Sequence, residues 1–286
     1  MTYHPLRVSA VRRLTPHMAR ISFDVNNADN AAVPVDDAGP DQYVKLFFPA
    51  PGQERPVLPP PLEGGSEDNA VLSWYRVYLA MPDAERPPMR TYTIRAIRPG
   101  EVDIDFVLHD AGPGSTWAEH AAVGDELIFL TPPHALYSVP EDTEWQLLVG
   151  DESTVPAVGA IVEGLPENAV LRAFVEIAGP EEEQAFDTAA KDVQITWVHR
   201  GSRPHGEAVL DAVRTAELPD GKAYAWLSGE ASLVKYARRH LVRERGVDKR
   251  SITFTGYWRQ GKSEEEVGRE SVQRIESGAP EPADDV

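Results

Sequence analysis

The sequence predicts a two-domain protein in which an N-terminal antiparallel β-barrel is followed by an α/β domain built on a parallel sheet. The chain has 286 residues, which favours two domains over one. Several short strands separated by turn signals occupy the first half. Strands and helices alternate in the second half, as expected for crossover helices on a parallel sheet. We place the domains at residues 1–140 and 141–262, with an acidic tail at 263–286.

The first domain shows the two-residue periodicity of strands. Residues 7–25 predict two short strands around the turn Leu14-Thr15-Pro16-His17. Apolar residues occupy every second position from Val102 to Leu108, which indicates a half-buried strand. The remaining strands are predicted at 43–48, 92–97 and 126–130, a short helix at 118–122, and surface loops rich in Pro, Gly and acidic residues at 33–41 and 49–69.

The second domain shows helix signals between apolar strands. Pro156 and Gly164 are placed at the start and end of one predicted helix. Another helix, over 231–245, has an apolar stripe and ends before Gly246. The predicted strands are 145–149, 171–177, 195–199, 223–227 and 252–255, and the predicted helices are 156–164, 206–215 and 231–245. The tail is expected to contain one amphipathic helix.

Composition excludes several kinds of chemistry. The chain has no Cys, which excludes disulfides, thiolate catalysis and the usual iron–sulfur ligation. Its eight His show no metal-ligand spacing, so no metal site is predicted. If the protein transfers electrons, an organic cofactor must carry them.

Charge and hydropathy limit the partners. The net charge of −18 argues against nucleic acid and anionic membrane surfaces. No apolar run approaches the length of about 18 residues that suggests a transmembrane helix, so no integral membrane segment is expected. The N-terminus lacks the apolar core of a signal peptide, and we expect a cytoplasmic protein.

The segment Met89–Arg95 carries the most informative pattern in the chain. Its alternation predicts a strand with Arg90 and Tyr92 on one face and the hydroxyl of Thr93 beside them. An Arg fork suits a diphosphate, and a Tyr ring suits a flat heteroaromatic group. The pattern resembles the flavin-binding strand of the ferredoxin-reductase-like flavoproteins. The alternative is an ordinary strand with an exposed Arg and a packed Tyr.

A second candidate is the loop His109–Trp117, which contains Gly112, Gly114, Ser115 and Thr116. Glycines allow a close approach of the backbone to a ligand, and the amides that open the following helix favour an anion. A diphosphate would fit this loop. The alternative is a turn in which Ser or Thr caps the helix.

Three more segments follow predicted strands of the second domain, where open α/β sheets bind nucleotides. They are 149–157, 226–230 and 255–262. The first has no GxGxxG and is therefore no Rossmann fingerprint. In the last, Tyr257 and Trp258 can stack on a ring, while Arg259 and Lys262 can meet an anion. The alternatives are a capped helix start and a packed aromatic pair beside solvated charges.

In this order the five segments resemble the siderophore-interacting protein family of flavin-dependent ferric-siderophore reductases, over residues 5–262. The resemblance is carried by Arg-Thr-Tyr-Thr, His-x-x-Gly-Pro-x-Ser-x-Trp-Ala, Gly-Asp-Glu-Ser-x-x-Pro-Ala, Gly-Glu-Ala and Gly-Tyr-Trp-Arg-x-Gly. It implies a ferredoxin-reductase-like fold with FAD between the domains and a reduced nicotinamide docking at the second domain.

The resemblance also implies roles for individual residues. The cofactors would be held by Arg90, Tyr92, Thr93, His109, Gly114, Ser115, Thr116, Asp151, Ser153, Thr154, Gly229, Glu230 and Trp258. A basic rim for the ferric siderophore would be formed by Lys45, Arg259 and Lys262. No side chain is expected to be catalytic, because the flavin carries the chemistry. One departure is Thr116, where many relatives have Arg.

The function implied is an FAD-dependent ferric-siderophore reductase, in which NAD(P)H reduces FAD and iron is released as Fe(II). The alternatives are a general NAD(P)H:flavin reductase or electron-transfer protein and a non-enzymatic siderophore-binding protein. We expect NADH rather than NADPH, because Glu176 lies near the end of the second strand and the run Glu181-Glu182-Glu183 follows it, and these carboxylates would repel a 2′-phosphate. Arg200 and Arg203 argue the other way. We expect a monomer.

Overall fold

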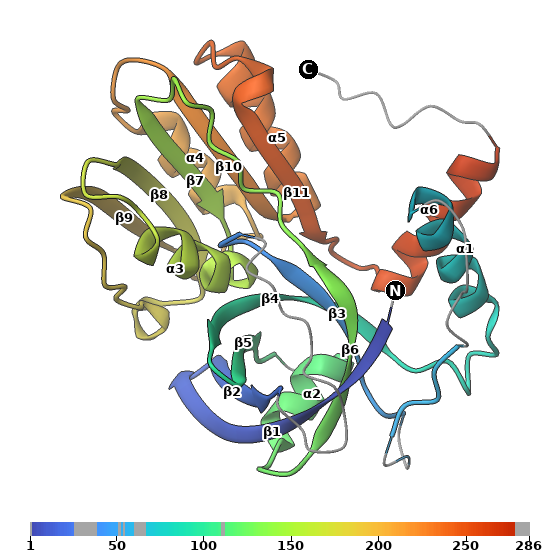
Figure 1. Cartoon of the computed structure of the whole chain (residues 1–286). Coiled ribbons are helices and arrows are strands. Elements are labelled where there is room, and N and C mark those ends of the chain that lie inside the picture. The colour runs from blue at the N-terminus through green and yellow to red at the C-terminus, as the bar shows by residue number, and fades with distance from the viewer. Residues whose placement is uncertain are drawn as a thin grey trace.

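The computed structural model describes residues 2–25, 39–50, 53, 55–59, 67–109 and 112–277. In these ranges the chain forms a closed antiparallel barrel and a five-stranded parallel sheet flanked by helices (Figure 1). This confirms the predicted fold class. Most of the loop predicted at 33–41, and part of the one predicted at 49–69, lies outside the described residues.

The barrel has the strand order β1-β2-β5-β4-β3-β6. Its strands are β1 (Thr2–Thr15), β2 (Met18–Asp24), β3 (Tyr43–Phe47), β4 (Met89–Arg98), β5 (Glu101–Val107) and β6 (Glu126–His134). The apolar alternation of β5 points Val102, Ile104 and Phe106 into a core where each is fully buried. The helix α2 (Pro113–His120) packs Trp117 and Ala118 against the same core.

The α2 helix begins five residues before the predicted start. Pro113 occupies the first helical turn, where a missing N–H costs nothing, and Gly112 precedes it with φ of 130°. Only glycine adopts this backbone angle readily. The glycine and proline of the loop therefore start a helix directly at the end of the barrel.

The parallel sheet has the order β11-β10-β7-β8-β9. Its strands are β7 (Trp145–Gly150), β8 (Val170–Ile177), β9 (Asp192–His199), β10 (Ala223–Glu230) and β11 (Ile252–Trp258), and its helices are α3 (Val155–Glu163), α4 (Glu207–Thr215) and α5 (Ala231–Arg243). Alternate residues of β10 supply two separate cores, with Trp226 on one face and Leu227 on the other. From β7 the chain adds β8 and β9 on one side of the sheet and then β10 and β11 on the other, although all five strands are parallel. This switch point between β7 and β10 creates the crevice where such sheets bind ligands.

Two helices pack outside these layers, side by side in Figure 1. The first, α1 (Glu67–Ala80), was not predicted, and the loop prediction is wrong for residues 67–69. Trp74 and Tyr78, four residues apart, are buried against Phe47, Met89 and Leu130 on the outer face of the barrel. The second, α6 (Glu264–Glu276), is the helix expected in the tail.

Buried polar groups join the two domains. Arg95 of β4 donates two hydrogen bonds, of 2.8 and 2.6 Å, to the carboxylate of Glu163 at the end of α3. The indole N–H of Trp226 donates to Asp41, just before β3, at 3.0 Å. Arg95, Asp41 and Trp226 are buried, so these polar groups would lose their partners if the domains moved apart, and this favours one relative position of the barrel and the sheet.

We predict that Arg95→Ala lowers the free energy of unfolding by about 1–2 kcal/mol, because it removes two hydrogen bonds to the exposed carboxylate of Glu163 and the packing of the buried Arg95 side chain. Urea unfolding followed by tryptophan fluorescence measures the change. Arg250→Ala is the control, because Arg250 is exposed and pairs only with Asp248 among the described residues. If the two variants are equally stable, the Arg95 pair does not hold the domains together.

Candidate functional site

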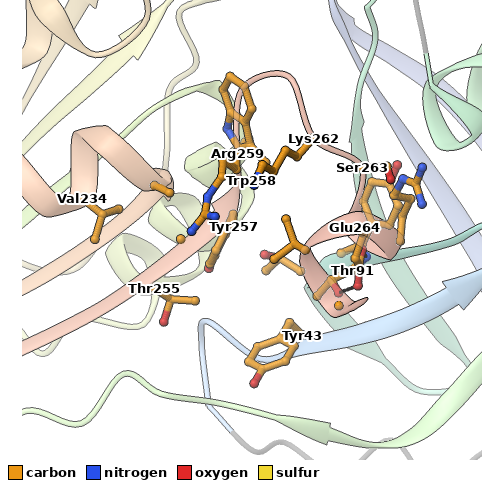
Figure 2. Close-up of a pocket in the computed structure, with 18 of the residues that line it drawn as sticks. Tyr43, Thr91, Val234, Thr255, Tyr257, Trp258, Arg259, Lys262, Ser263 and Glu264 are labelled. Atoms are coloured by element: carbon orange, nitrogen blue, oxygen red, sulfur yellow. Dashed lines mark hydrogen bonds between the residues drawn. The ribbon is translucent and has the colours of Figure 1, made fainter. Parts of the chain in front are cut away.

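A cavity of about 1520 Å³ lies between the barrel and the α/β domain. Its walls come from β3 and β4, from the carboxyl ends of the sheet strands, and from α5 and α6. Figure 2 shows Val234, Thr255 and Tyr257 on one side, and Thr91 and Glu264 on the other. The volume exceeds the range of about 300–1,000 Å³ that is typical for a drug-sized ligand, so the cavity can hold a dinucleotide.

The strand β4 brings Arg90, Tyr92 and Thr93 to this cavity, as the sequence predicted. The ring of Tyr92 lies 4.4 Å from that of Phe106, and burial raises the pKa of its phenol, which stays neutral. Its hydroxyl reaches α2 so closely that a Cβ at Gly114 would overlap it. Thr93 is buried and hydrogen-bonded with the hydroxyl of Tyr257. The strand therefore presents a cation, an aromatic ring and a hydroxyl in sequence.

The loop and helix after β5 divide into cavity-facing and internal residues. His109 and Gly112 line the cavity, and the N-terminus of α2 has no side-chain cap. The hydroxyl of Ser115 is used internally: it donates to the His109 carbonyl at 2.7 Å and accepts from the His109 amide at 2.8 Å. Thr116 is exposed on α2 and does not line the cavity. This leaves the first amides of α2 to meet an anion.

Asp151, directly after β7, is buried and holds three strand ends together. Its Oδ1 accepts from the amide and hydroxyl of Ser153, at 2.9 and 2.5 Å. Its Oδ2 accepts from the amide of Glu230 at 2.7 Å and from the indole N–H of Trp258 at 3.0 Å. A Cβ at Gly229 would lie only 2.6 Å from this oxygen. Burial raises the pKa of Asp151, and the bonds it accepts partly offset that effect.

Glu230 and Thr154 complete this arrangement at the edge of the sheet. Glu230 caps α5, because its Oε2 accepts from the amides of Ser232 and Leu233 at 2.5 and 3.2 Å. The hydroxyl of Thr154 donates to the Asp151 carbonyl at 2.7 Å. Both side chains are buried and neither lines the cavity. These two side chains therefore stabilise the backbone next to the cavity and are not placed to contact a ligand.

Most cations of the cavity are paired with carboxylates. Lys45 lies 2.6 Å from Glu264, and Arg90 lies 2.6 Å from Glu265. Arg259 lies 3.5 Å from Glu270, which also pairs with Lys262. Both hydrogen bonds of Arg90 use Nη1, so among the described residues Nε and Nη2 keep their donors for another anion. Arg200, after β9, lies 2.8 Å from Glu152.

The structure brings nine of the sixteen predicted site residues to the cavity. They are Lys45, Arg90, Tyr92, Thr93, His109, Ser153, Trp258, Arg259 and Lys262. The others, Gly114, Ser115, Thr116, Asp151, Thr154, Gly229 and Glu230, lie outside the lining. Sequence reasoning assigned no site role to Tyr43, Tyr75 or the α5 cations Lys235, Arg238 and Arg239, all of which line the cavity. The spacing of these cations on a helix that follows a strand end was a usable signal.

The acidic residues expected to meet the nicotinamide ribose do not line the cavity. Glu176 is fully buried and accepts from the amides of Gly206 and Val209 at the start of α4. Glu182 binds Thr15 and His17 of the barrel, and Glu183 pairs with His199. This reason for expecting NADH is wrong, whereas the preference itself stays a prediction.

The donors of the cavity fit FAD. A partly free guanidinium and an uncapped helix N-terminus suit its diphosphate, while Tyr92 and Trp258 offer ring faces. On the opposite side of the cavity lies the crevice at the carboxyl ends of the parallel strands. The barrel and the parallel sheet together form a ferredoxin-reductase-like fold. A ferredoxin–NADP⁺ reductase from Neisseria gonorrhoeae, solved with bound FAD and NADP, shares the fold with a TM-score of 0.57, at 13% identity over 90% of this chain and all of that one.

The chain belongs to the siderophore-interacting protein family. The family model "Siderophore-interacting FAD-binding domain" matches residues 7–136, and "Siderophore-interacting protein" matches residues 143–261.

Individual relatives match along nearly the whole chain. An uncharacterized protein of Mycobacterium tuberculosis is 37% identical, with 92% of each chain covered. The NADPH-dependent ferric-chelate reductase of Escherichia coli is 30% identical, covering 90% of this chain and 93% of that one. The crystal structure of a siderophore utilization protein from T. fusca has a TM-score of 0.75 at 35% identity, covering 92% and 94%. In the described part of the chain, no helix has the length and apolar character needed to cross a bilayer.

We predict that Asp151→Ala lowers the free energy of unfolding by about 2–4 kcal/mol, because it leaves the buried amide of Glu230 and the partly buried N–H groups of Ser153 and Trp258 without this acceptor. Ser153→Ala, the control, removes only the hydroxyl bond and should cost about 1 kcal/mol. Urea unfolding of both variants measures the difference. Equal losses would show that the Asp151 carboxylate does not organise the strand ends.

Proposed function

We propose that the protein is an FAD-dependent ferric-siderophore reductase that takes electrons from NAD(P)H and releases iron as Fe(II). Membership of the siderophore-interacting family and similarity to a ferric-chelate reductase support an oxidoreductase of this class. The observation that carries the proposal is the cavity itself, which has the Arg90-Tyr92-Thr93 strand on one side and the switch point of a parallel sheet on the other. The first fits a flavin and the second fits a nicotinamide nucleotide.

In this proposal Arg90 and the N-terminus of α2 hold the FAD diphosphate. Tyr92 and Trp258 would pack against its ring system, with the Thr93 hydroxyl beside them. His109 and Ser153 contact the bound cofactors from the cavity wall. At the N-terminus of α2 the amides of Gly114 and Ser115 would meet the diphosphate, since Pro113 has no N–H and the Thr116 amide donates to the Gly112 carbonyl. Asp151, Thr154, Gly229 and Glu230 keep these groups in place without touching the ligand. When bound, FAD supplies hydride acceptance from a nicotinamide and one-electron delivery to Fe(III).

The substrate is placed at the rim formed by Lys45, Arg259 and Lys262. These residues line the cavity, where β3 and the segment after β11 meet α6. Iron leaves after reduction because Fe(II) binds the hard siderophore oxygens more weakly than Fe(III). Within the proposal, a cytoplasmic monomer stays our expectation.

We predict that the purified protein is yellow and holds FAD noncovalently, and that Arg90→Ala weakens FAD binding by about 2 kcal/mol, or about 30-fold. Flavin fluorescence titration of the apoprotein measures the dissociation constant. Arg98→Ala is the matched control, since Arg98 lies on the same strand but does not line the cavity. A colourless protein that fails to bind added FAD would contradict the proposed enzyme. A protein that reduces free flavin but no ferric chelate would be the general flavin reductase instead.

We predict that NADH is the better donor, because the cavity gives a 2′-phosphate little free positive charge near β9. Arg200 lies 2.8 Å from Glu152 and 3.7 Å from Glu176, so its charge is already compensated. Steady-state flavin reduction with each nucleotide gives the ratio of kcat/KM. Glu152→Gln should raise the relative value for NADPH by freeing Arg200. A wild-type kcat/KM for NADPH equal to or above that for NADH would refute the preference.

A further inference from the structure

The helix α6 lies beyond residue 261, where the matched family model ends, and it carries carboxylates to the proposed substrate rim. Glu264 Oε1 lies 2.6 Å from the ammonium of Lys45, and its Oε2 accepts from the amide of Thr91 at 3.1 Å. Glu270 pairs with Arg259 at 3.5 Å and with Lys262. Every cation of the predicted rim therefore faces an α6 carboxylate.

Several contacts fix α6 in this position. Ser263 and Glu266 form a capping box at its start. Gly268 packs on α1 so closely that a Cβ there would overlap Tyr75. Arg269 pairs with Asp83 at 3.0 Å, and Glu265 pairs with Arg90. The rim carboxylates thus belong to a docked helix, which Figure 1 shows against α1 and the barrel.

The result is a rim of low net charge with an apolar wall. The three rim cations face two carboxylates, and the hydrogen bond from Lys262 lowers the pKa of Glu270, which is therefore ionised at neutral pH. The cavity side of α6 adds Val267, Val272 and Ile275. A multiply anionic chelate would have to displace these carboxylates or approach them, whereas an uncharged chelate would not.

We propose that α6 lowers the affinity of the iron site for anionic ferric chelates relative to neutral and cationic ones, with Glu264 and Glu270 as the specificity-determining residues. This inference rests on the proposed function, since it assumes that the rim receives the ferric chelate. Because α5 also brings Lys235, Arg238 and Arg239 to the cavity, the test compares α6 variants and does not depend on the wild-type preference alone.

The test uses one linear trihydroxamate whose terminal amine is free, acetylated or succinylated. The three metal complexes share one coordination centre and carry one positive charge, no charge and one negative charge. Their gallium(III) forms cannot be reduced, so titration of the full-length, FAD-loaded protein by tryptophan fluorescence reports binding alone. In the wild type, where the α6 carboxylates offset most of the rim charge, the three dissociation constants should differ by less than about fivefold, the scale of a unit charge partly screened at the protein surface.

In Glu264→Gln/Glu270→Gln the succinylated complex should bind about tenfold more tightly than it does to the wild type, whereas the complex with the free amine should gain no affinity. The control is Glu276→Gln on the same helix, because Glu276 pairs with Arg76 and does not line the cavity, and it should keep the wild-type affinities. The single variants Glu264→Gln and Glu270→Gln should give intermediate shifts, and thermal unfolding checks that each variant is folded. A double variant in which the succinylated complex gains no affinity over the wild type, or no binding of any gallium complex, would overturn the inference.

The iron(III) forms separate this inference from the proposed function. The photoreduced, FAD-loaded protein is mixed anaerobically with each ferric complex, and flavin reoxidation is followed by absorbance. Reoxidation with the same dependence on charge and variant supports both. If no ferric complex reoxidises the flavin while the gallium complexes bind as expected, the reductase proposal fails and the role of α6 stands.

Discussion

The buried carboxylate of Asp151 is the constraint on which the cavity depends. It accepts bonds from the 3₁₀ turn after β7, from the end of β10 and from Trp258 at the end of β11. These strand ends surround the point where the sheet order reverses. Without a shared acceptor, their N–H groups would be buried unpaired or the strands would separate. One side chain thus fixes the shape of the α/β face of the site.

The local charge of the cavity is set by ion pairs between its cations and nearby carboxylates, and not by the net charge of the whole chain. The chain carries a net charge of −18, yet its cavity concentrates Lys and Arg side chains from both domains. Burying such cations unpaired would be costly, and Glu152, Glu264, Glu265 and Glu270 compensate five of them. The site can therefore bind ligands of modest charge within a strongly acidic protein, and the choice among ligands depends on which carboxylates can be displaced.

Local patterns in the sequence were sufficient for the fold class and for much of the site. The change from two-residue to helical periodicity near residue 141 predicted the two architectures. Arg90 and Tyr92 both line the cavity, but Thr91 and Thr93 line it as well, which alternation alone does not predict. What the sequence could not reveal depends on contacts distant along the chain. The pair Lys45–Glu264 joins residues 219 positions apart. The helix α1 is stabilised by packing on the barrel, and no local motif predicts that contact. In the same way, Glu176 accepts a hydrogen bond from the start of α4 and therefore does not face the crevice.

The predicted site residues separate into two groups with different physical roles. Residues on the cavity surface offer charge, ring faces and hydroxyls to a ligand. The side chains of Ser115, Asp151, Thr154 and Glu230 instead form hydrogen bonds with nearby backbone groups. A sequence motif contains both groups because a loop of fixed shape needs internal bonds as much as ligand contacts. It follows that motif residues cannot be read as ligand contacts one by one. Replacing a residue with internal hydrogen bonds should change ligand binding through the shape of the cavity and should also lower the free energy of unfolding. Replacing a residue that lines the cavity should change ligand binding without that loss of stability.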